Sequence, residues 1–283
     1  MSLDFIPTVW AGRLLTALQK SLVYGQVGVA NRDYEGEILA AGNTVKIASI
    51  GDVSIGDYTK DTDITDPDIL TDDEQSLVID QQKYFNFYVD SIDRAQQNVN
   101  TLDEAMRRAG WQLRDAADTF LAGVMDAAVP TGNKIGTLTT PIVPTKDTAY
   151  EYLVDLSVLL DEKNVPIEGR FVVVPAWFQG LLLKDERFIL SGTQTGDAAR
   201  RNAEVGEAAG FSILKSNSVP NTAGAKYRLI AGHAIATAYV EQVLDVQNYK
   251  PEKRFGDAVK GLHVYGAKVV RPDALACLIA SKS

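Results

Sequence analysis

Residues 94–128 decide the fold of this chain, and they read RAQQNVNTLDEAMRRAGWQLRDAADTFLAGVMDAA. Apolar or small side chains recur there in steps of four and three residues, which places them along one stripe of an α-helix. The stripe consists of Ala95, Val99, Leu102, Met106, Ala109, Leu113, Ala116, Phe120 and Val124. Such a helix would span roughly 50 Å at about 1.5 Å per residue, which suits a protein that has to define a distance.

The start of this helix has two interpretations. Either one helical register runs from about residue 94, or Thr101 and Glu104 form a capping-box pattern and the main rod begins just after Thr101. At the other end, Pro130 and Gly132 are typical of a helix stop.

Residues 36–92, directly before the helix, read as a strand-rich extension. Polar and apolar side chains alternate over 42–48, 52–58 and 75–89, as expected for half-exposed strands. Residues 58–73 are rich in Asp and Thr and contain almost no core-forming side chains. The pattern predicts a long β-hairpin loop with a polar tip. Because an isolated two-stranded ribbon is marginally stable in water, it would need another surface to lie on.

Residues 1–35 read as an N-terminal arm. A helical pattern over 9–24 is followed by a stretch over 24–32 that looks extended. One short amphipathic helix followed by extended chain has too little apolar area to fold alone. The arm therefore needs a neighbour, either within the chain or on another chain.

Residues 147–220 look like a separate α/β unit. We expect a helix over 147–162, a buried strand over 170–175, a helix over 176–183, an exposed loop over 191–206 and a strand over 210–216. Strands return over 226–283, with a helix-like stretch at 234–240 and an apolar stretch at 274–280.

Composition restricts the class of protein. The chain has 283 residues, of which 46% are hydrophobic and 23% charged, as in globular proteins with a sizeable core. A net charge of −9 argues against a surface that binds nucleic acid, because such surfaces contact the phosphates through Lys and Arg side chains. The N-terminus lacks a basic, apolar leader pattern, and the apolar runs are shorter than the roughly 20 residues that cross a bilayer. We expect a protein made in a cytosol that does not enter membranes.

Residue patterns typical of enzymes are nearly absent. Cys277 is the only cysteine, so no intrachain disulfide exists, and its apolar neighbours predict a buried structural thiol. His233 and His263 are 30 residues apart, without the paired ligands of a zinc site, and we expect both to be structural. Neither a phosphate-binding Gly-rich loop nor a Gly-x-Ser-x-Gly elbow occurs. The sequence predicts no enzyme, no catalytic residues and no cofactor.

The acidic segment at residues 57–74 is the strongest candidate for chemistry. Asp61, Asp63, Asp66 and Asp68 alternate with other residues and are candidate metal ligands through their carboxylates. The glycine and flanking helices of an EF-hand are missing, so we interpret the segment as a solvated tip that keeps the loop soluble. A third interpretation is docking onto basic residues of a neighbouring subunit. The available basic residues are Arg107, Arg108, Arg200, Arg201, Lys250, Lys253 and Arg254.

The order of parts resembles the major capsid proteins of tailed bacteriophages, which have the Hong Kong phage-type capsid fold. The segments that carry the likeness are FNFYVDSIDRAQ at 85–96, RFVVVPAWF at 170–178, and EVGEAAGFSI at 204–213 followed by SNSVP at 216–220. The resemblance covers nearly the whole chain and depends on the order and spacing of these segments. It implies an α+β protein with an N-terminal arm, an extended β-hairpin loop, a long spine helix, and peripheral and axial domains.

By this resemblance, the arm is residues 1–35 and the extended loop residues 36–92. The peripheral domain with its spine helix comprises 93–144 and 236–283, and the axial domain comprises 145–235. The family forms hexamers and pentamers that close an icosahedral shell around double-stranded DNA. Implied partners are copies of the chain itself and scaffolding, portal and decoration proteins. The DNA is enclosed without specific binding. The implied location is the virion, after assembly in the cytoplasm of a host bacterium.

Three hypotheses follow for the function. The first is a structural shell subunit of a phage, which explains the arm and loop that cannot fold alone and the missing active site. The second is the shell subunit of an encapsulin-type compartment with the same fold. The third is a metal-dependent hydrolase that uses Asp61, Asp63, Asp66 and Asp68.

Overall fold

A computed structural model describes residues 22–34, 44–50, 57, 60, 63, 72–90, 101–185, 187, 206–252 and 256–282. The helix expected over 9–24 and the loop expected over 191–206 lie almost entirely outside these ranges, as does most of the strand expected over 52–58.

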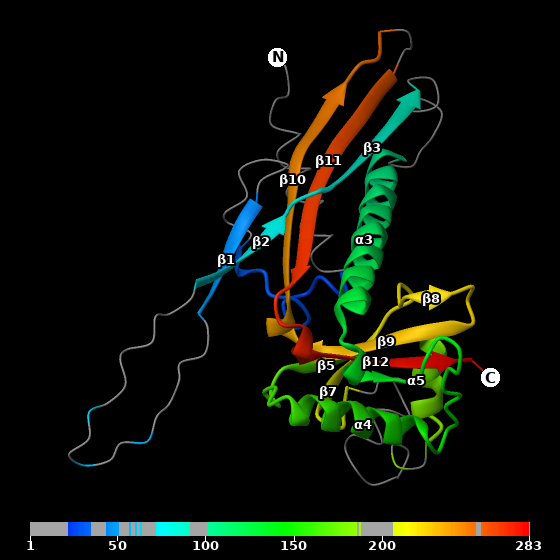
Figure 1. The fold of residues 1–283 in the computed structure, drawn as a ribbon. Coiled ribbons are helices and arrows are strands. Elements are labelled where there is room, and N and C mark those ends of the chain that lie inside the picture. The colour runs from blue at the N-terminus through cyan, green and yellow to red at the C-terminus, as the bar shows by residue number, and fades with distance from the viewer. Residues whose placement is uncertain are drawn as a thin grey trace.

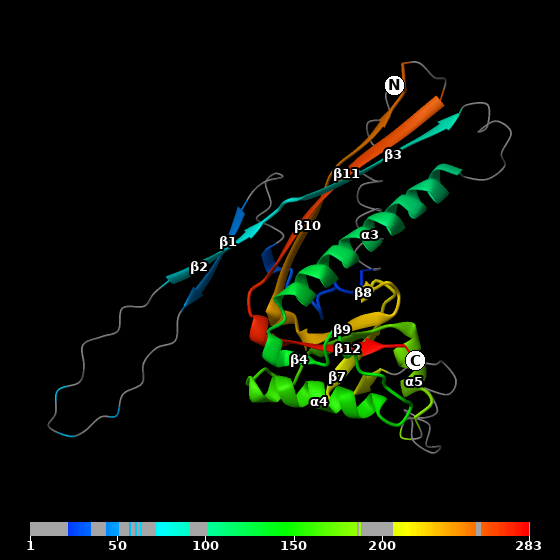
Figure 2. The same ribbon diagram turned by 45° about the vertical axis from the view of Figure 1, so that its right-hand side comes forward.

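The long helix lies along one face of a three-stranded antiparallel sheet. The helix is α3 (Thr101–Ala128), and the strand order in the sheet is β10 (Thr237–Tyr249), β11 (Gly256–Val269) and β3 (Gln81–Asp90). Both views show α3 running beside these strands (Figures 1 and 2). Since residues 91–100 lie outside the described ranges, both interpretations of the start of the helix remain predictions.

A two-stranded ribbon leads away from this sheet. β1 (Thr44–Ile50) pairs antiparallel with β2 (Asp72–Val78), in a register that runs from Thr44 opposite Val78 to Ile50 opposite Asp72. Two residues separate β2 from β3, so the ribbon continues the line of β3 away from the body (Figure 1). This pairing confirms the β-hairpin predicted for the loop.

A second body is built around a seven-stranded sheet. Its strands are β4 (Lys134–Ile135), β12 (Leu275–Ser281), β9 (Lys226–His233), β5 (Arg170–Val174), β7 (Phe211–Lys215) and β6 (Glu207–Ala208), in that order, with β8 (Asn221–Thr222) paired to β9. The helices α4 (Ala149–Glu162) and α5 (Ala176–Leu182) pack below the sheet, whereas α3 lies on the other side (Figure 1). Three 3₁₀ turns complete the described elements, namely η2 (Thr131–Asn133), η3 (Ala234–Ala236) and η4 (Pro272–Ala274).

Most expected elements of this body lie within two residues of their predicted bounds. Two predictions were wrong. The helix-like stretch at 234–240 is a short 3₁₀ turn followed by the start of β10, because Thr237–Val240 pairs with β11. Residues 275–281, which we assigned to the peripheral set 236–283, form β12 and pair with β9, so they belong to the larger sheet. The backbone of an apolar strand can form hydrogen bonds in either sheet. The strand that lies next to it in the folded chain decides which sheet it joins.

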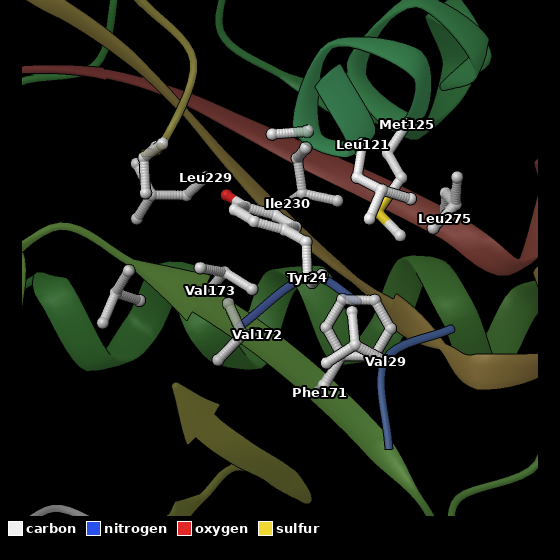
Figure 3. Packing of buried hydrophobic residues seen from close by; sticks show 14 of the residues in the cluster. Tyr24, Val29, Leu121, Met125, Phe171, Val172, Val173, Leu229, Ile230 and Leu275 are labelled. Atoms are coloured by element: carbon white, nitrogen blue, oxygen red, sulfur yellow. The ribbon is translucent and has the colours of Figure 1, made fainter. Parts of the chain in front are cut away.

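The core lies where α3 meets the larger sheet. Tyr24 from the N-terminal side is fully buried there among Leu121 and Met125 of α3 and strand residues of β5 and β9 (Figure 3). The described buried apolar side chains of α3 are Leu113, Ala117, Leu121, Ala122 and Met125. The predicted stripe residues Ala116, Phe120 and Val124 are half-buried instead. A stripe with a period near 3.5 drifts around a helix of 3.6 residues per turn, so the buried face moves one position by the last turns.

Candidate functional site

The two histidines have different surroundings. Nδ1 of His233 accepts a hydrogen bond from the Ile235 N–H at 3.1 Å, so Nε2 is the nitrogen that donates to the Glu168 carbonyl at 2.9 Å. His233 therefore closes the η3 turn, as expected for a structural residue. His263 is fully buried, and its Nε2 lies 3.4 Å from Oε2 of Glu241. Its ring centroid lies 4.9 Å from that of Tyr265.

Cys277 lies in the middle of β12 and is fully buried. Burial and, to a smaller extent, the nearby Asp126 carboxylate raise the pKa of its thiol to about 12, while Lys134 and Arg228 act in the opposite direction. A thiol with so high a pKa carries almost no thiolate at neutral pH and is a poor nucleophile. The structure confirms the prediction of a buried structural thiol.

The acidic tip of the loop falls mostly outside the described residues. Asp63 is described and exposed, whereas Asp61, Asp66 and Asp68 are not described. Within the described part of the chain, no three His, Cys, Asp or Glu side chains gather as a metal site would require. The metal ligands proposed from the sequence remain a prediction.

Residues 22–34, which we call the arm root, are held to the spine helix by a buried carboxylate. Asp118 of α3 accepts hydrogen bonds from the backbone N–H groups of Val23 and Tyr24, both at 3.0 Å. Burial raises the pKa of the Asp118 carboxyl to about 6, although these N–H groups and that of Gly25 act in the opposite direction. The carboxylate supplies acceptors for backbone donors that the core would otherwise leave unpaired.

The arm root also extends the edge of β10. The Asn31 N–H donates to the Thr237 carbonyl at 2.8 Å, and the Tyr239 N–H donates to the Asn31 carbonyl at 2.9 Å. One residue later, the Arg32 guanidinium pairs with Glu241 and also donates to the Gly25 carbonyl at 2.8 Å.

Glu241 is the centre of a buried polar cluster at the base of the three-stranded sheet. Its Oε1 contacts Arg32, and its Oε2 accepts from the Tyr239 hydroxyl at 2.8 Å. Burial opposes ionisation, but His263, Arg32 and Tyr239 together lower the pKa of the Glu241 carboxyl below its ordinary value. The arm root is thus fixed at two points, one on α3 and one on β10.

Sequence reasoning did not find Asp118, Arg32 or Glu241. A signal was present for two of them, because Asp118 stands beside the apolar stripe of α3 and Glu241 follows Tyr239 on the same side of a strand. A carboxylate in such a position has to find a partner. The partners that join the arm root to the body lie 94 or more residues apart in the chain, so the sequence pattern could not name them.

Several large apolar side chains are exposed, and they lie in separate parts of the chain. Tyr84 of β3 is 78% exposed, Val27 of the arm root 74%, Ile167 after α4 67% and Trp111 of α3 56%. Scattered exposure of this kind is compatible with many modest contacts made by separate surfaces.

Of the basic residues considered as docking partners, three are described. Arg107 and Arg108 are exposed on α3, and Lys250 is exposed just after β10. Arg200, Arg201, Lys253 and Arg254 lie outside the described residues. Among the described helices, none combines the length and apolar character needed to cross a membrane.

Comparisons with known proteins identify the family. A sequence profile described as phage capsid protein matches residues 73–278, which is most of the chain. No curated protein sequence matches.

Solved structures show the same likeness. A chain from Mycobacterium phage Che8 is 30% identical, with a TM-score of 0.73 and 91% of each chain covered. The capsid of cyanophage P-SCSP1u is 19% identical with a TM-score of 0.67, covering 87% of this chain and 85% of that one. The mature capsid of bacteriophage PhiM1 is 18% identical with a TM-score of 0.63, covering 84% and 82%.

The last two likenesses show the fold, and the first supports the family as well. The mixed helices and sheets match the Hong Kong phage-type capsid fold predicted from the order of segments. This family and fold are structural and not enzymatic. The chain therefore belongs to the phage capsid protein family, among the major capsid proteins of tailed phages.

Proposed function

We propose that this chain is the repeating subunit of an icosahedral phage shell, that it assembles into hexamers and pentamers, and that the shell encloses double-stranded DNA. The observation that carries the proposal is the β1–β2 ribbon, which leads away from the body of its own chain (Figures 1 and 2). The likeness over 91% of the Che8 chain supports it. A ribbon of two strands gains stability when it lies on a further surface, and in a shell that surface is a sister copy.

The division into parts belongs to the same proposal. The arm is residues 1–35, the extended loop 36–92, the peripheral domain 93–144 with 236–274, and the axial domain 145–235 joined by β12. The hydrogen bonds that Asp118, Asn31 and Arg32 make support a fixed arm root in this division.

Other partners follow from the proposed assembly. A shell of this kind is built in the cytoplasm of the host bacterium and needs scaffolding and portal proteins, and a decoration protein can bind its outside. The net charge of −9 supports enclosure of DNA without specific binding, because a negatively charged protein surface repels the phosphates of DNA.

The proposal is tested by expressing the chain and separating the products by sedimentation, followed by electron microscopy. Capsomers or closed shells are expected. A protein that stays monomeric at high concentration, with its loop folded back on its own body, contradicts the proposal.

The two alternatives are separated by specific observations. The family match to phage capsids favours a phage shell over an encapsulin compartment. Neighbouring genes for portal and terminase proteins would agree with the phage shell, and a cargo-enzyme gene would not. The hydrolase hypothesis requires metal-dependent turnover that Asp63→Asn abolishes.

A further inference from the structure

The arm root crosses the junction between α3 and β10 and contacts a buried carboxylate on each of them. Asp118 of α3 is 2% exposed, and Glu241 of β10 is 5% exposed. Tyr24 and Val29 of the arm root are fully buried among core side chains (Figure 3). Detachment of the arm root would therefore remove contacts from both carboxylates.

The two attachment points differ in their chemistry. The Asp118 carboxylate accepts hydrogen bonds from backbone N–H groups of residues 23–25. Glu241 pairs instead with the guanidinium of Arg32. A backbone N–H is a neutral donor, whereas a guanidinium carries a positive charge. The arm root thus brings a cation to Glu241 and only backbone dipoles to Asp118 among these contacts.

Gly25 connects the two attachment points. Its N–H bonds to Asp118, and its carbonyl accepts a hydrogen bond from Nη1 of Arg32 at 2.8 Å. A Cβ at this position would lie 3.0 Å from Cδ1 of Leu22 and 3.2 Å from Cε1 of Tyr239, so the backbone packs closely against β10 here. Detachment at Gly25 would break a contact with each point.

Other titratable and charged groups surround both carboxylates. Asp118 interacts with Arg114 of its own helix and with Tyr24, which in turn lies near Asp126 of α3 and Cys277 of β12. The groups around Glu241 are Arg32, Tyr239 of β10, and His263 and Tyr265 of β11, with Asp80 near Tyr265. The cation near Asp118 belongs to α3 and stays there when the arm root detaches. The arm-root cation at Glu241 leaves with the arm root.

Protons therefore act in opposite directions at the two points. Burial raises the pKa of the Asp118 carboxyl from 3.8 to about 6, so the attached arm root favours the protonated form. Burial opposes ionisation of Glu241 as well, but His263 and Arg32 lower the pKa of its carboxyl below the ordinary 4.5. Attachment to α3 is strongest below pH 4 and weakens as the pH rises through 6. Attachment to β10 is complete above pH 4.5 and weakens as the pH falls below it.

We propose that the arm root is a proton-linked strap, which mild acid fastens to α3 and stronger acid releases from β10. The strap joins residues 1–21 to the body, so the pH of the solution sets how firmly the N-terminal part of the chain is anchored. It belongs to a single copy, and its response to pH is measurable whether or not the chain forms a shell.

Hydrogen–deuterium exchange of the full chain tests the attachment to α3. The amides of residues 23–25 are compared with those of β5, which report unfolding of the body, after correction for the pH dependence of intrinsic exchange. From pH 5 to pH 8, protection of residues 23–25 should fall by roughly tenfold relative to β5, because the Asp118 carboxyl loses its proton in this range. Protection that is independent of pH, or that rises with pH, overturns the proposal.

Two matched variants separate titration of Asp118 from a purely structural role. Asp118→Asn keeps an oxygen that accepts hydrogen bonds but removes the titrating group, so protection of residues 23–25 should no longer change between pH 5 and pH 8. Asp155→Asn, at an exposed position of α4, should keep the tenfold change. A pH dependence that persists in Asp118→Asn assigns the effect to another group and contradicts the proposal.

The attachment to β10 is tested in the same experiment. The Asn31 N–H, which donates to the Thr237 carbonyl, reports this end of the arm root. In the unaltered chain, Asn31 should lose protection between pH 5 and pH 4 while residues 23–25 do not. Glu241→Gln, which removes the charge that holds Arg32, should lower protection of Asn31 already at pH 5. Equal losses at Asn31 and at residues 23–25, or none at Asn31, contradict the opposite directions.

Discussion

The seven-stranded sheet and the β1–β2 ribbon differ in what covers their strands. Every residue of β5 is buried, with β7 and β9 on its two sides and helices on both faces. In the ribbon, Ile47 and Leu77 are buried in a small cluster with Ala238, Val240 and Val264, while Lys46 and Ser76 are exposed. The body is completed within one chain. The ribbon is anchored by Ile47 and Leu77, and polar side chains beside them are exposed.

The comparison separates folding from assembly along the chain. Substitutions in the body should change the free energy of unfolding, whereas changes beyond the base of the ribbon should change assembly alone. The following predictions test this difference, from the largest expected effect to the smallest.

Leu121→Asp should prevent folding, because it places a carboxylate without a partner at a fully buried position of α3. The expected cost is about 4 kcal/mol or more. Met106→Asp, at a half-buried position of the same helix, is the control and should be tolerated better. Chemical denaturation of both variants checks this, and equal losses would contradict the assignment of the buried face.

The free energy of unfolding should depend on pH because the Asp118 carboxyl is buried. Its folded pKa of about 6 lies above the ordinary aspartic acid value of 3.8, so the folded state binds an extra proton between these two pH values. Stability from this group is therefore highest below pH 4 and falls as the pH rises towards 6, by about 3 kcal/mol in total.

The measurement for Asp118 is the difference in unfolding free energy between the unaltered chain and Asp118→Asn across this pH range. Asp155→Asn, exposed on α4, controls for the loss of one carboxylate. A difference that stays flat, or that grows in favour of the unaltered chain as the pH rises, would contradict the raised pKa.

Gly266→Ala should destabilise the junction between the ribbon and the sheet. A Cβ at Gly266 would lie 2.6 Å from the Val78 carbonyl oxygen and 3.0 Å from Cα of Ile79, so the strands have to separate. The expected cost is about 1–3 kcal/mol. Gly123→Ala on α3 meets nothing within 4 Å and should stabilise the chain by about 0.5–1 kcal/mol. Thermal unfolding of the two variants measures both effects.

Deletion of residues 58–71 should have the smallest effect on stability, within about 0.5 kcal/mol, because it removes no described core residue. The same deletion should impair shell closure. Calorimetry and electron microscopy of one preparation measure the two outcomes together. Unchanged particles would mean that the loop tip is not part of an interface.

The sequence predicted elements that depend on neighbouring residues better than elements that depend on pairing with distant strands. The expected helix over 147–162 is α4 at Ala149–Glu162, and the expected strand over 170–175 is β5 at Arg170–Val174. Both elements are indicated by the periodicity of neighbouring side chains. The start of β10 looked helical, and β12 was placed with the wrong sheet, because pairing with a distant strand decides these cases.

The candidate surfaces show the same limit. Asp63 was predicted to lie in a solvated acidic tip, and it is exposed. The sequence around it does not indicate which surface it contacts. Arg32 and Glu241 lie 209 residues apart, and nothing in either local pattern points to the other. Tyr84 and Leu262 lie side by side only because β3 pairs with β11.

The sequence by itself determined the long helix, the α/β unit, the hairpin loop with its acidic tip, and the absence of a local pattern for catalysis. These properties follow from the periodicity and composition of short segments. The tertiary structure decided which sheet each strand joined, which face of α3 was buried, and where the arm root was fixed. The physical reason is that buried carboxylates and strand edges are satisfied by whichever partner the packed chain brings near, and that partner is far away in sequence.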